Sequence, residues 1–321
     1  MRRRQVLTLL SVFAAYSAAT LAQSKSIPKV GIVGSLNQRA IDEFKGGLRD
    51  FGLIDGDTVI VVGNPARAAS PEAVSKTVSD FISQGINVIF ASGAVAGKAA
   101  KNATSTIPIV CLTGDLVKAG LVESLASPGG NVTGISILTA EASAKRLELL
   151  IQIVPTLERA AVFYNLDDPT ASLSVEPTKA AAAKMQVRLQ VIGVHGQSDF
   201  PSAIAAAVNA NVQAIALTSN PLFDIAGQQI AELALQNKLA TVSFADSFPE
   251  AGGLLSYGPS IFAEYHHAAH FAARILRGAK PADLPVEQPT KYRLGINLKT
   301  ARALNLKVPE MLLASADTVI E

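Results

Sequence analysis

Short apolar runs alternate with longer stretches of helical periodicity along most of the chain, and few folds accommodate such a pattern. The first apolar run, Lys29–Val33, precedes a helical pattern over Gln38–Phe51, and the alternation continues to about Phe244. The runs are apolar throughout, which is typical of strands that are buried on both faces. Strands and helices in this order predict parallel sheets with right-handed crossovers.

The alternation falls into two sets, which predict two α/β lobes. In the first set we expect strands at Thr58–Val62, Asn87–Ala91, Ile107–Leu112 and Asn131–Ile135. In the second we expect a helix over Glu141–Ile153 and strands at Arg159–Tyr164, Arg188–Val194, Val212–Thr218 and Leu239–Phe244, with helices such as Leu222–Gln236 between them. A chain of 321 residues, 49% of them hydrophobic, suits two domains of modest size.

The last part of the chain fits a return crossing between these lobes rather than a third domain. A glycine-led strand over Gly252–Tyr257 precedes a helix over Ser260–Leu276 and a further strand over Lys291–Asn297. The predicted fold is therefore two doubly wound parallel-sheet lobes joined by a multi-strand hinge. Lobe I takes residues 27–137 and 258–289, and lobe II takes residues 138–257 and 290–321.

The N-terminus has the pattern of a secretory signal peptide. The basic head Met1–Arg4 precedes the uncharged apolar stretch Val6–Leu21, and small residues end it at Ala22. We expect residues 1–22 to be removed after export, since the apolar stretch is short for a membrane span. No cysteine lies directly after the signal, where a lipid would be attached, so we expect a free periplasmic protein without a lipid anchor. The arginine pair leaves both the general and the twin-arginine export routes open.

Export also changes the charge of the chain. Arg2, Arg3 and Arg4 are three of the 28 basic residues, and none of the 26 acidic residues precedes Ala22, so removal of 1–22 turns the net charge from +2 to −1. The mature chain then lacks the basic surface that nucleic-acid binding requires.

The single cysteine, Cys111, forms no internal disulfide and lies in an apolar run, which predicts a buried thiol.

Candidate ligand contacts follow the predicted strands, because open parallel sheets bind ligands beyond their carboxyl ends. Most of these residues are small or polar, and the set holds no histidine, cysteine or arginine. The predicted ligand-binding residues are Ser35, Asn37, Ser92, Gly93, Ala94, Thr113, Asp115, Asn165, Ser219, Asn220, Asp246 and Tyr257.

Five of these residues suggest an amino-acid-like ligand. Ser92–Ala94 opens a predicted helix, whose free backbone N–H groups can hold a carboxylate without an arginine. Asp115 and Asp246 can hold an ammonium group. The alternative interpretation is that all of these are ordinary caps and turn residues, which strand ends commonly carry.

Enzyme and metal motifs are missing from the sequence. It has no Gly-x-Ser-x-Gly elbow, no phosphate-binding loop and no paired-cysteine metal site. His266 and His270 lie four apart on one predicted helix, but no third ligand completes a zinc pattern, which favours a solvated polar face. We therefore expect neither a cofactor nor a metal, and no catalytic residue.

Several long strings resemble one known family. They are Thr106–Val110, Gly120–Ala126, Ser127–Gly134, Lys145–Leu150, Glu250–Gly258 and Gly278–Thr290. In order and over the whole mature chain, the sequence resembles the substrate-binding proteins of ABC transporters, in particular the tryptophan-binding type. The resemblance implies a periplasmic-binding-protein fold that traps a small-molecule ligand between two lobes by hinge closure. It also implies a monomer that serves an ABC permease and ATPase in the inner membrane.

The resemblance places seven candidates at the cleft of the family: Ser92, Ala94, Thr113, Asp115, Asn165, Asn220 and Asp246. Some members resemble binders of aromatic amino acids or purine-like solutes. Leu116 follows Asp115 where the family often has proline, and Phe244–Asp246 replaces a variable stretch, so ligand specificity is not transferable. Two alternatives stay open: an exported enzyme on the same fold, with Asp115 or Asp246 as base, and a ligand-sensing partner of a membrane receptor.

Overall fold

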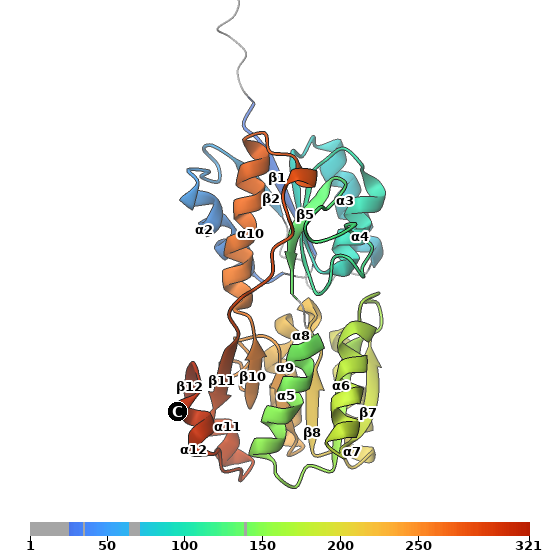
Figure 1. Cartoon of the computed structure of the whole chain (residues 1–321), viewed down its shortest axis with the longest axis vertical. Helices are drawn as coiled ribbons and strands as arrows, with labels where there is room; N and C mark the ends of the chain where they lie inside the picture. The colour runs from blue at the N-terminus through green and yellow to red at the C-terminus, as the bar shows by residue number, and fades with distance from the viewer. Residues whose placement is uncertain (1–25, 35, 64–70, 138–139) are drawn as a thin grey trace, which may run out of the picture.

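The computed structural model describes residues 26–34, 36–63, 71–137 and 140–321. The predicted signal peptide (1–22) and the candidate Ser35 lie outside the described residues. The described chain forms two lobes, one above the other in Figure 1, and each contains one sheet between layers of helices. The fold is α/β with two parallel-sheet lobes, as the sequence predicts.

The sheet of lobe I has five parallel strands in the order β2-β1-β3-β4-β5. These are β1 (Lys29–Gly34), β2 (Ile60–Gly63), β3 (Val88–Ser92), β4 (Ile109–Thr113) and β5 (Val132–Ser136). Helices α2 (Gln38–Asp50) and α10 (Ile261–Leu276) cover one face, and α3 (Pro71–Ser83) and α4 (Ala94–Ala103) cover the other. The neighbouring strands β3 and β4 are buried along their whole length, which explains their largely apolar sequences, and the edge strand β5 is buried as well.

The sheet of lobe II has seven strands in the order β12-β11-β10-β9-β8-β6-β7. These are β6 (Arg159–Asn165), β7 (Arg188–Val194), β8 (Ala214–Leu217), β9 (Ala240–Ser243), β10 (Leu255–Gly258), β11 (Arg293–Asn297) and β12 (Thr318–Ile320). Helices α5 (Ala140–Ile153) and α6 (Ser172–Lys184) pack on one face, and α7 (Phe200–Asn209) and α9 (Gly227–Gln236) pack on the other. The short helices are α8 (Pro221–Ile225), α11 (Leu298–Ala303) and α12 (Glu310–Ala314), with the 3₁₀ turns η1 (Gln197–Asp199) and η2 (Pro281–Asp283).

Three details differ from the sequence-based expectation. β10 pairs antiparallel with β11, so the second sheet is mixed rather than fully parallel. The direction reverses because the chain leaves β10 for α10 in lobe I and comes back into β11 from that side. The edge strand β12 was not expected, and the helix predicted over Leu222–Gln236 divides at Ala226 into α8 and α9.

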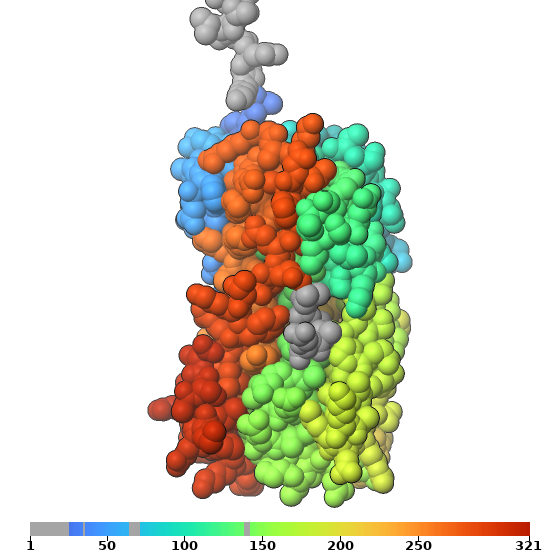
Figure 2. Space-filling model, in the orientation of Figure 1, coloured from blue at the N-terminus to red at the C-terminus, as the bar shows by residue number. Residues whose placement is uncertain are grey.

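The chain passes between the lobes three times, which makes a multi-strand hinge. It passes after β5, again between β10 and α10, and finally from η2 into β11. In Figure 2 the last of these segments forms part of the surface across the boundary between the lobes. The passes bring α10 to the side of α2 in lobe I, although the whole of lobe II up to β10 separates them in sequence.

Glycine is required where α2 and α10 approach each other. A Cβ atom at Gly47 of α2 would lie 2.1 Å from the carbonyl oxygen of His266 in α10. Nothing larger than hydrogen fits there without separating the two helices.

Among the helices of the described part of the chain, none is both long and apolar enough to cross a membrane.

Candidate functional site

Apart from β11 and β12, which run in the opposite direction, the strands of both sheets point their carboxyl ends at the space between the lobes, and two adjacent chambers lie there. The smaller encloses about 400 Å³ and the larger about 880 Å³, open mouths included. Ser92, Gly93, Ala94 and Pro221 line both chambers, and a Cβ atom at Gly93 of lobe I would lie 3.5 Å from Pro221 Cγ of lobe II. The lobes are therefore closed against each other in this structure.

The wall from lobe I is the turn from β3 into α4. Gly93 has φ +92, a left-handed value that favours glycine, and its N–H donates to the Leu112 carbonyl at 2.8 Å. No side chain caps the N-terminus of α4, and Ala94, Val95 and Ala96 of its first turn line the larger chamber. The first N–H groups of a helix lack partners within the helix and carry partial positive charge. This turn can therefore accept an anionic group without a basic side chain.

Beneath this turn, Ser92 and Tyr265 form a buried hydrogen-bonded pair. Their hydroxyl oxygens lie 3.0 Å apart, and both side chains line the smaller chamber. Burial raises the pKa of the Tyr265 phenol above its ordinary value, and the nearby Asp224 carboxylate raises it further. Tyr265 therefore stays protonated, so its hydroxyl retains a proton to donate.

The wall from lobe II contains a carboxylate that the sequence analysis did not single out. Asp224, in α8, lies deep in the molecule, and the surface it keeps exposed lines the smaller chamber. Burial raises the pKa of Asp224 to about 6, and repulsion by Asp246 adds to the shift, whereas a hydrogen bond from Ser247 and the charge of Arg39 oppose it. The Ser247 hydroxyl donates to Asp224 Oδ1 at 3.2 Å.

Asp246 lies close to Asp224 and is similarly short of partners. Its Oδ1 is buried and has no hydrogen-bond partner among the described residues. Buried carboxylate oxygens without a donor are costly, so this pair has a capacity for a cationic group that the described chain does not fill. Among the described lining residues of both chambers there is no lysine and no arginine.

Next to this pair, four side chains are joined by hydrogen bonds near the ends of β6 and β8. Asp168 Oδ1 accepts from Thr170 through its N–H at 2.8 Å and its hydroxyl at 2.6 Å, and Asp168 Oδ2 accepts from Asn220 Nδ2 at 2.7 Å. Asn220 Oδ1 in turn accepts from the Leu222 N–H at 2.9 Å, which caps α8, and from Asn165 Nδ2 at 3.4 Å. Because these groups are already paired, we assign them the role of fixing α8 and hence Asp224.

The predicted residues divide into three groups. Seven line the chambers: Ser92, Gly93, Ala94, Thr113, Asn165, Ser219 and Asn220. Asp246 lies behind Asp224, as described above. The other three described candidates lie elsewhere: Asn37 caps α2 by accepting from the Ala40 N–H at 2.9 Å, Asp115 accepts from the Val117 and Lys118 N–H groups of its own turn, and Tyr257 stacks on Tyr292 beside a separate cavity of lobe II.

Sequence reasoning missed four lining residues that matter to the chemistry: Asp168, Asp224, Phe244 and Tyr265. Phe244 was named only as part of a divergent stretch. Asp224 and Tyr265 lie inside helices, and the strand-end rule does not reach helix interiors. One signal was available for Asp224, because Asn220-Pro221 is a helix start placed directly after a strand.

Comparison with known proteins gives a consistent result. The family described as ABC transporter substrate binding protein matches residues 29–320. A "Tyrosine-binding protein" of Clostridioides difficile is 28% identical over 290 residues, which is 88% of this chain and 83% of that protein. A conserved domain protein of Vibrio cholerae is 26% identical, with a TM-score of 0.84 over 92% of this chain and 100% of that one. An ABC domain from Streptococcus pneumoniae, solved in complex with L-Trp, is 24% identical, with a TM-score of 0.82 over the same shares.

Proposed function

The chain belongs to the family of ABC transporter substrate-binding proteins, and on that basis we propose that it is a periplasmic receptor that delivers an amino acid to an ABC importer. The family consists of binding proteins rather than enzymes. The observation that carries the amino-acid assignment is the opposition of two features across the two adjacent chambers, whose walls share Ser92, Gly93, Ala94 and Pro221. An underpaired acidic pair lies on lobe II, and an uncapped helix N-terminus lies on lobe I.

In this proposal the ligand ammonium binds Asp224. Asp224 faces the chamber, has one modest hydrogen bond from Ser247, and lies against a second carboxylate, Asp246. A bound ammonium supplies the positive charge and the donors that both carboxylates lack, and it returns Asp224 to its ionised form. The strand-end rule suggests Asp115 and Asp246 for this role, whereas Asp224 is a carboxylate that lines the chamber.

The ligand carboxylate binds the first turn of α4. The N–H groups of Ala94, Val95 and Ala96 lie on the wall of the larger chamber, and Gly93 has no side chain to obstruct the approach. Ser92 adds a hydroxyl beside them. This arrangement favours a zwitterion over a dianion, because Asp168 and Asp224 repel a second negative charge.

In this proposal the side chain of the ligand packs against the apolar wall of the smaller chamber. Leu112, Ile137, Phe244 and Ile261 contribute to its lining. An aromatic or large aliphatic side chain suits these surfaces. The names of the relatives, a tyrosine-binding protein and a domain in complex with L-Trp, support the aromatic choice.

The remaining parts of the proposal follow from family membership. The receptor works as a monomer with an ABC permease and ATPase of the inner membrane, and residues 1–22 direct its export. Lobe I comprises residues 27–137 and 258–289, and lobe II comprises 138–257 and 290–321. Transport takes precedence over a sensory role because the matching family is that of transporter receptors.

The absence of tryptophan from the sequence makes a direct test possible. Excitation at the red edge of the tryptophan band excites only added L-Trp, so its emission reports binding without a protein background. The protein is unfolded, dialysed and refolded first, to remove any retained ligand. L-Trp emission should shift and gain polarisation, and L-Tyr and L-Phe should compete.

Two analogues separate the two ends of the ligand. Tryptamine lacks the carboxylate and indole-3-propionate lacks the ammonium, and both should bind at least about tenfold more weakly than L-Trp, since each loses a charge-assisted hydrogen bond. If neither the aromatic nor the aliphatic amino acids bind, the amino-acid class is wrong. Equal affinity for all three compounds would refute the charge assignment while leaving the receptor function intact.

A further inference from the structure

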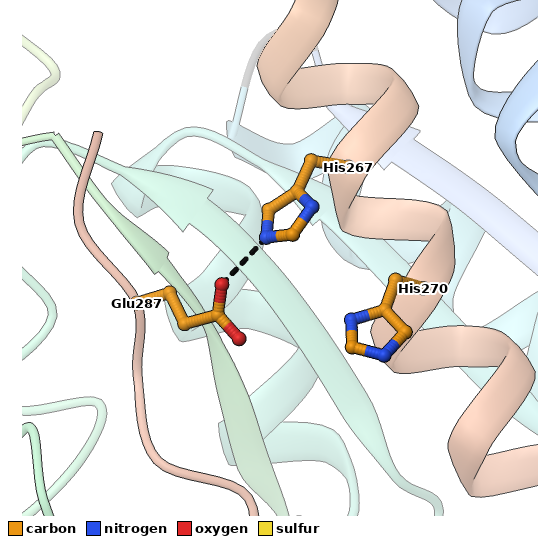
Figure 3. A group of neighbouring side chains, drawn as sticks. All are labelled: His267, His270 and Glu287. Atoms are coloured by element: carbon orange, nitrogen blue, oxygen red, sulfur yellow. Dashed lines mark hydrogen bonds and ion pairs between the residues drawn. The ribbon is translucent and has the colours of Figure 1, made fainter. Parts of the chain in front are cut away.

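A second group of functional side chains lies on lobe I, on the surface of α10 and outside both chambers. His267 and His270 occupy successive turns of α10, and Glu287 lies on the segment that leads from η2 towards β11. One ligand atom from each lies within 4.8 Å of the other two. Figure 3 shows the Glu287 carboxylate facing the two imidazole rings.

This group differs from the histidine pair that the sequence suggests. His266 and His270 are four residues apart, but His266 turns to α2, where its Nε2 lies 2.7 Å from Asp50 Oδ2 and its Nδ1 lies 3.6 Å from Glu43 Oε2. His267 and His270, three apart, share one face of the helix. The third ligand, missing from the sequence pattern, comes from a segment that only the fold brings to this face.

The backbone that carries the Glu287 carboxylate is fixed by hydrogen bonds. The Glu287 N–H donates to the Gly134 carbonyl at 3.0 Å, and its own carbonyl accepts from the Ser136 N–H at 2.8 Å, so the backbone is fixed along β5. Buried Val286 anchors the segment on one side. The Glu287 Oε2 atom lies 2.6 Å from His267 Nε2. A rigid backbone of this kind is what a preformed ligand site needs.

The ion pair between His267 and Glu287 does not involve the third side chain of the group, His270. His270 makes no hydrogen bond within the described part of the chain, and its ring lies between Phe51, with centroids 5.4 Å apart, and His267, with centroids 5.7 Å apart. Burial lowers the pKa of His270, the charges of His267 and Arg274 lower it further, and the charge of Glu287 opposes the shift. An imidazole nitrogen that has no hydrogen-bond partner is available to bind a metal ion.

The surrounding charges also favour a cation. Glu264, one turn before His267 on the same face of α10, has a raised pKa because it is partly buried; the charge of His267 opposes this shift and the charge of Glu287 adds to it. Two carboxylates, Glu264 and Glu287, thus repel each other beside the two imidazoles, with Arg274 as a neighbouring positive charge. A divalent ion between the rings relieves this repulsion.

We propose that His267, His270 and Glu287 bind a divalent transition-metal ion, and that Zn²⁺ is the ion that suits them best. Two imidazole nitrogens and one carboxylate oxygen form a known zinc donor set, and water completes four-coordination. Two imidazoles select against Mg²⁺ and Ca²⁺, which prefer oxygen ligands. In tetrahedral geometry the ligand atoms lie about 3.3 Å apart, so small side-chain rotations convert the observed cluster into the bound form.

The test uses the full-length mature protein without a histidine tag, stripped with EDTA and titrated with Zn²⁺ alone. Calorimetry and native mass spectrometry should both give one Zn²⁺ per chain, and Mg²⁺ or Ca²⁺ should give none. His270→Ala and Glu287→Gln should each lower the affinity for Zn²⁺ by more than about tenfold, because removal of a direct ligand exceeds the effect of removing its supporting hydrogen bond.

The matched control is His266→Ala, which removes the neighbouring imidazole from the same helix but leaves the proposed ligands in place. Its zinc affinity should equal that of the unmodified protein. The site assignment is wrong if the unmodified protein binds no Zn²⁺, or if His266→Ala loses Zn²⁺ to the same extent as His270→Ala. Circular dichroism of each variant confirms that the fold is retained, and the L-Trp assay reports separately on the cleft.

Discussion

Asp224→Asn should raise the free energy of unfolding of the ligand-free protein and lower its affinity for the ligand. In the folded protein, burial holds the pKa of Asp224 at about 6 rather than 3.8. A raised carboxyl pKa means that the fold favours the neutral form. The contribution of this group to stability is therefore full below pH 4 and lost as the pH rises through about 6.

The difference between a pKa of 3.8 and one of about 6 corresponds to about 2–3 kcal/mol in the free energy of unfolding, with the lower figure allowing for water in the chamber. Asn is neutral and of similar size, so it escapes this loss. The free energy of unfolding of Asp224→Asn should exceed that of the unmodified protein by about 2–3 kcal/mol at pH 8, and the difference should vanish near pH 4. Urea unfolding followed by circular dichroism at pH 4, 6 and 8 measures it.

Ligand affinity should change in the opposite direction. Loss of a charge-assisted hydrogen bond of about 1.5–3 kcal/mol raises the Kd for L-Trp or L-Tyr by about 10- to 100-fold. Affinity for indole-3-propionate, which has no ammonium, should not fall. Asp115→Asn is the control, because Asp115 caps its own turn outside both chambers and Asn retains the acceptor. A stability difference that does not vary with pH, or an equal loss of affinity for indole-3-propionate, would refute the assignment of Asp224.

Three further experiments test the packing. Gly47→Ala places a Cβ atom 2.1 Å from the His266 carbonyl oxygen, so it should lower the free energy of unfolding by about 1–3 kcal/mol in urea titrations. An unchanged urea midpoint would mean that α2 and α10 can separate without cost. Tyr265→Phe leaves the buried Ser92 hydroxyl without its partner and should lower that free energy by about 1–3 kcal/mol; a neutral result would mean that water replaces the phenol. Burial raises the pKa of Cys111 to about 12, so the thiol should react with an aromatic disulfide reagent only after denaturation, and rapid labelling at pH 8 in buffer would contradict its burial.

The fold was predictable from the sequence because the signal for a doubly wound sheet is local and repeated. Fully buried strands such as Val88–Ser92 are apolar at every position but the last, and the helices between them carry their own periodicity. What escaped prediction lacks such a signal. β12 has only three residues, and none of them is fully buried. The antiparallel pairing of β11 depends on the route of the chain between lobes, which no local pattern records.

The candidate site was predictable only where it follows from strand ends. The turn at Ser92–Ala94 lies at the chamber because the carboxyl end of β3 opens there. Asp115 also follows a strand, yet its carboxylate accepts from the N–H groups of its own turn, which matches the cap interpretation. Asp224 escaped because a helical pattern gives no indication of which side faces a cavity formed by the other lobe. Glu287 escaped because its neighbourhood is irregular in sequence.

The position of α10 determines the order in which the lobes can fold during synthesis. The central strands of lobe II and the helices on them come from one uninterrupted stretch, 140–243, and can assemble as soon as that stretch leaves the ribosome. Lobe I begins earlier in the chain but stays incomplete, because Phe44 and its apolar neighbours on α2 pack against α10, which ends at Leu276. Folding from the N-terminus is the usual sequence of events in multidomain chains. In this protein the lobe that is encoded first stays incomplete until the central part of the second lobe has been made, and its open face needs protection until α10 arrives.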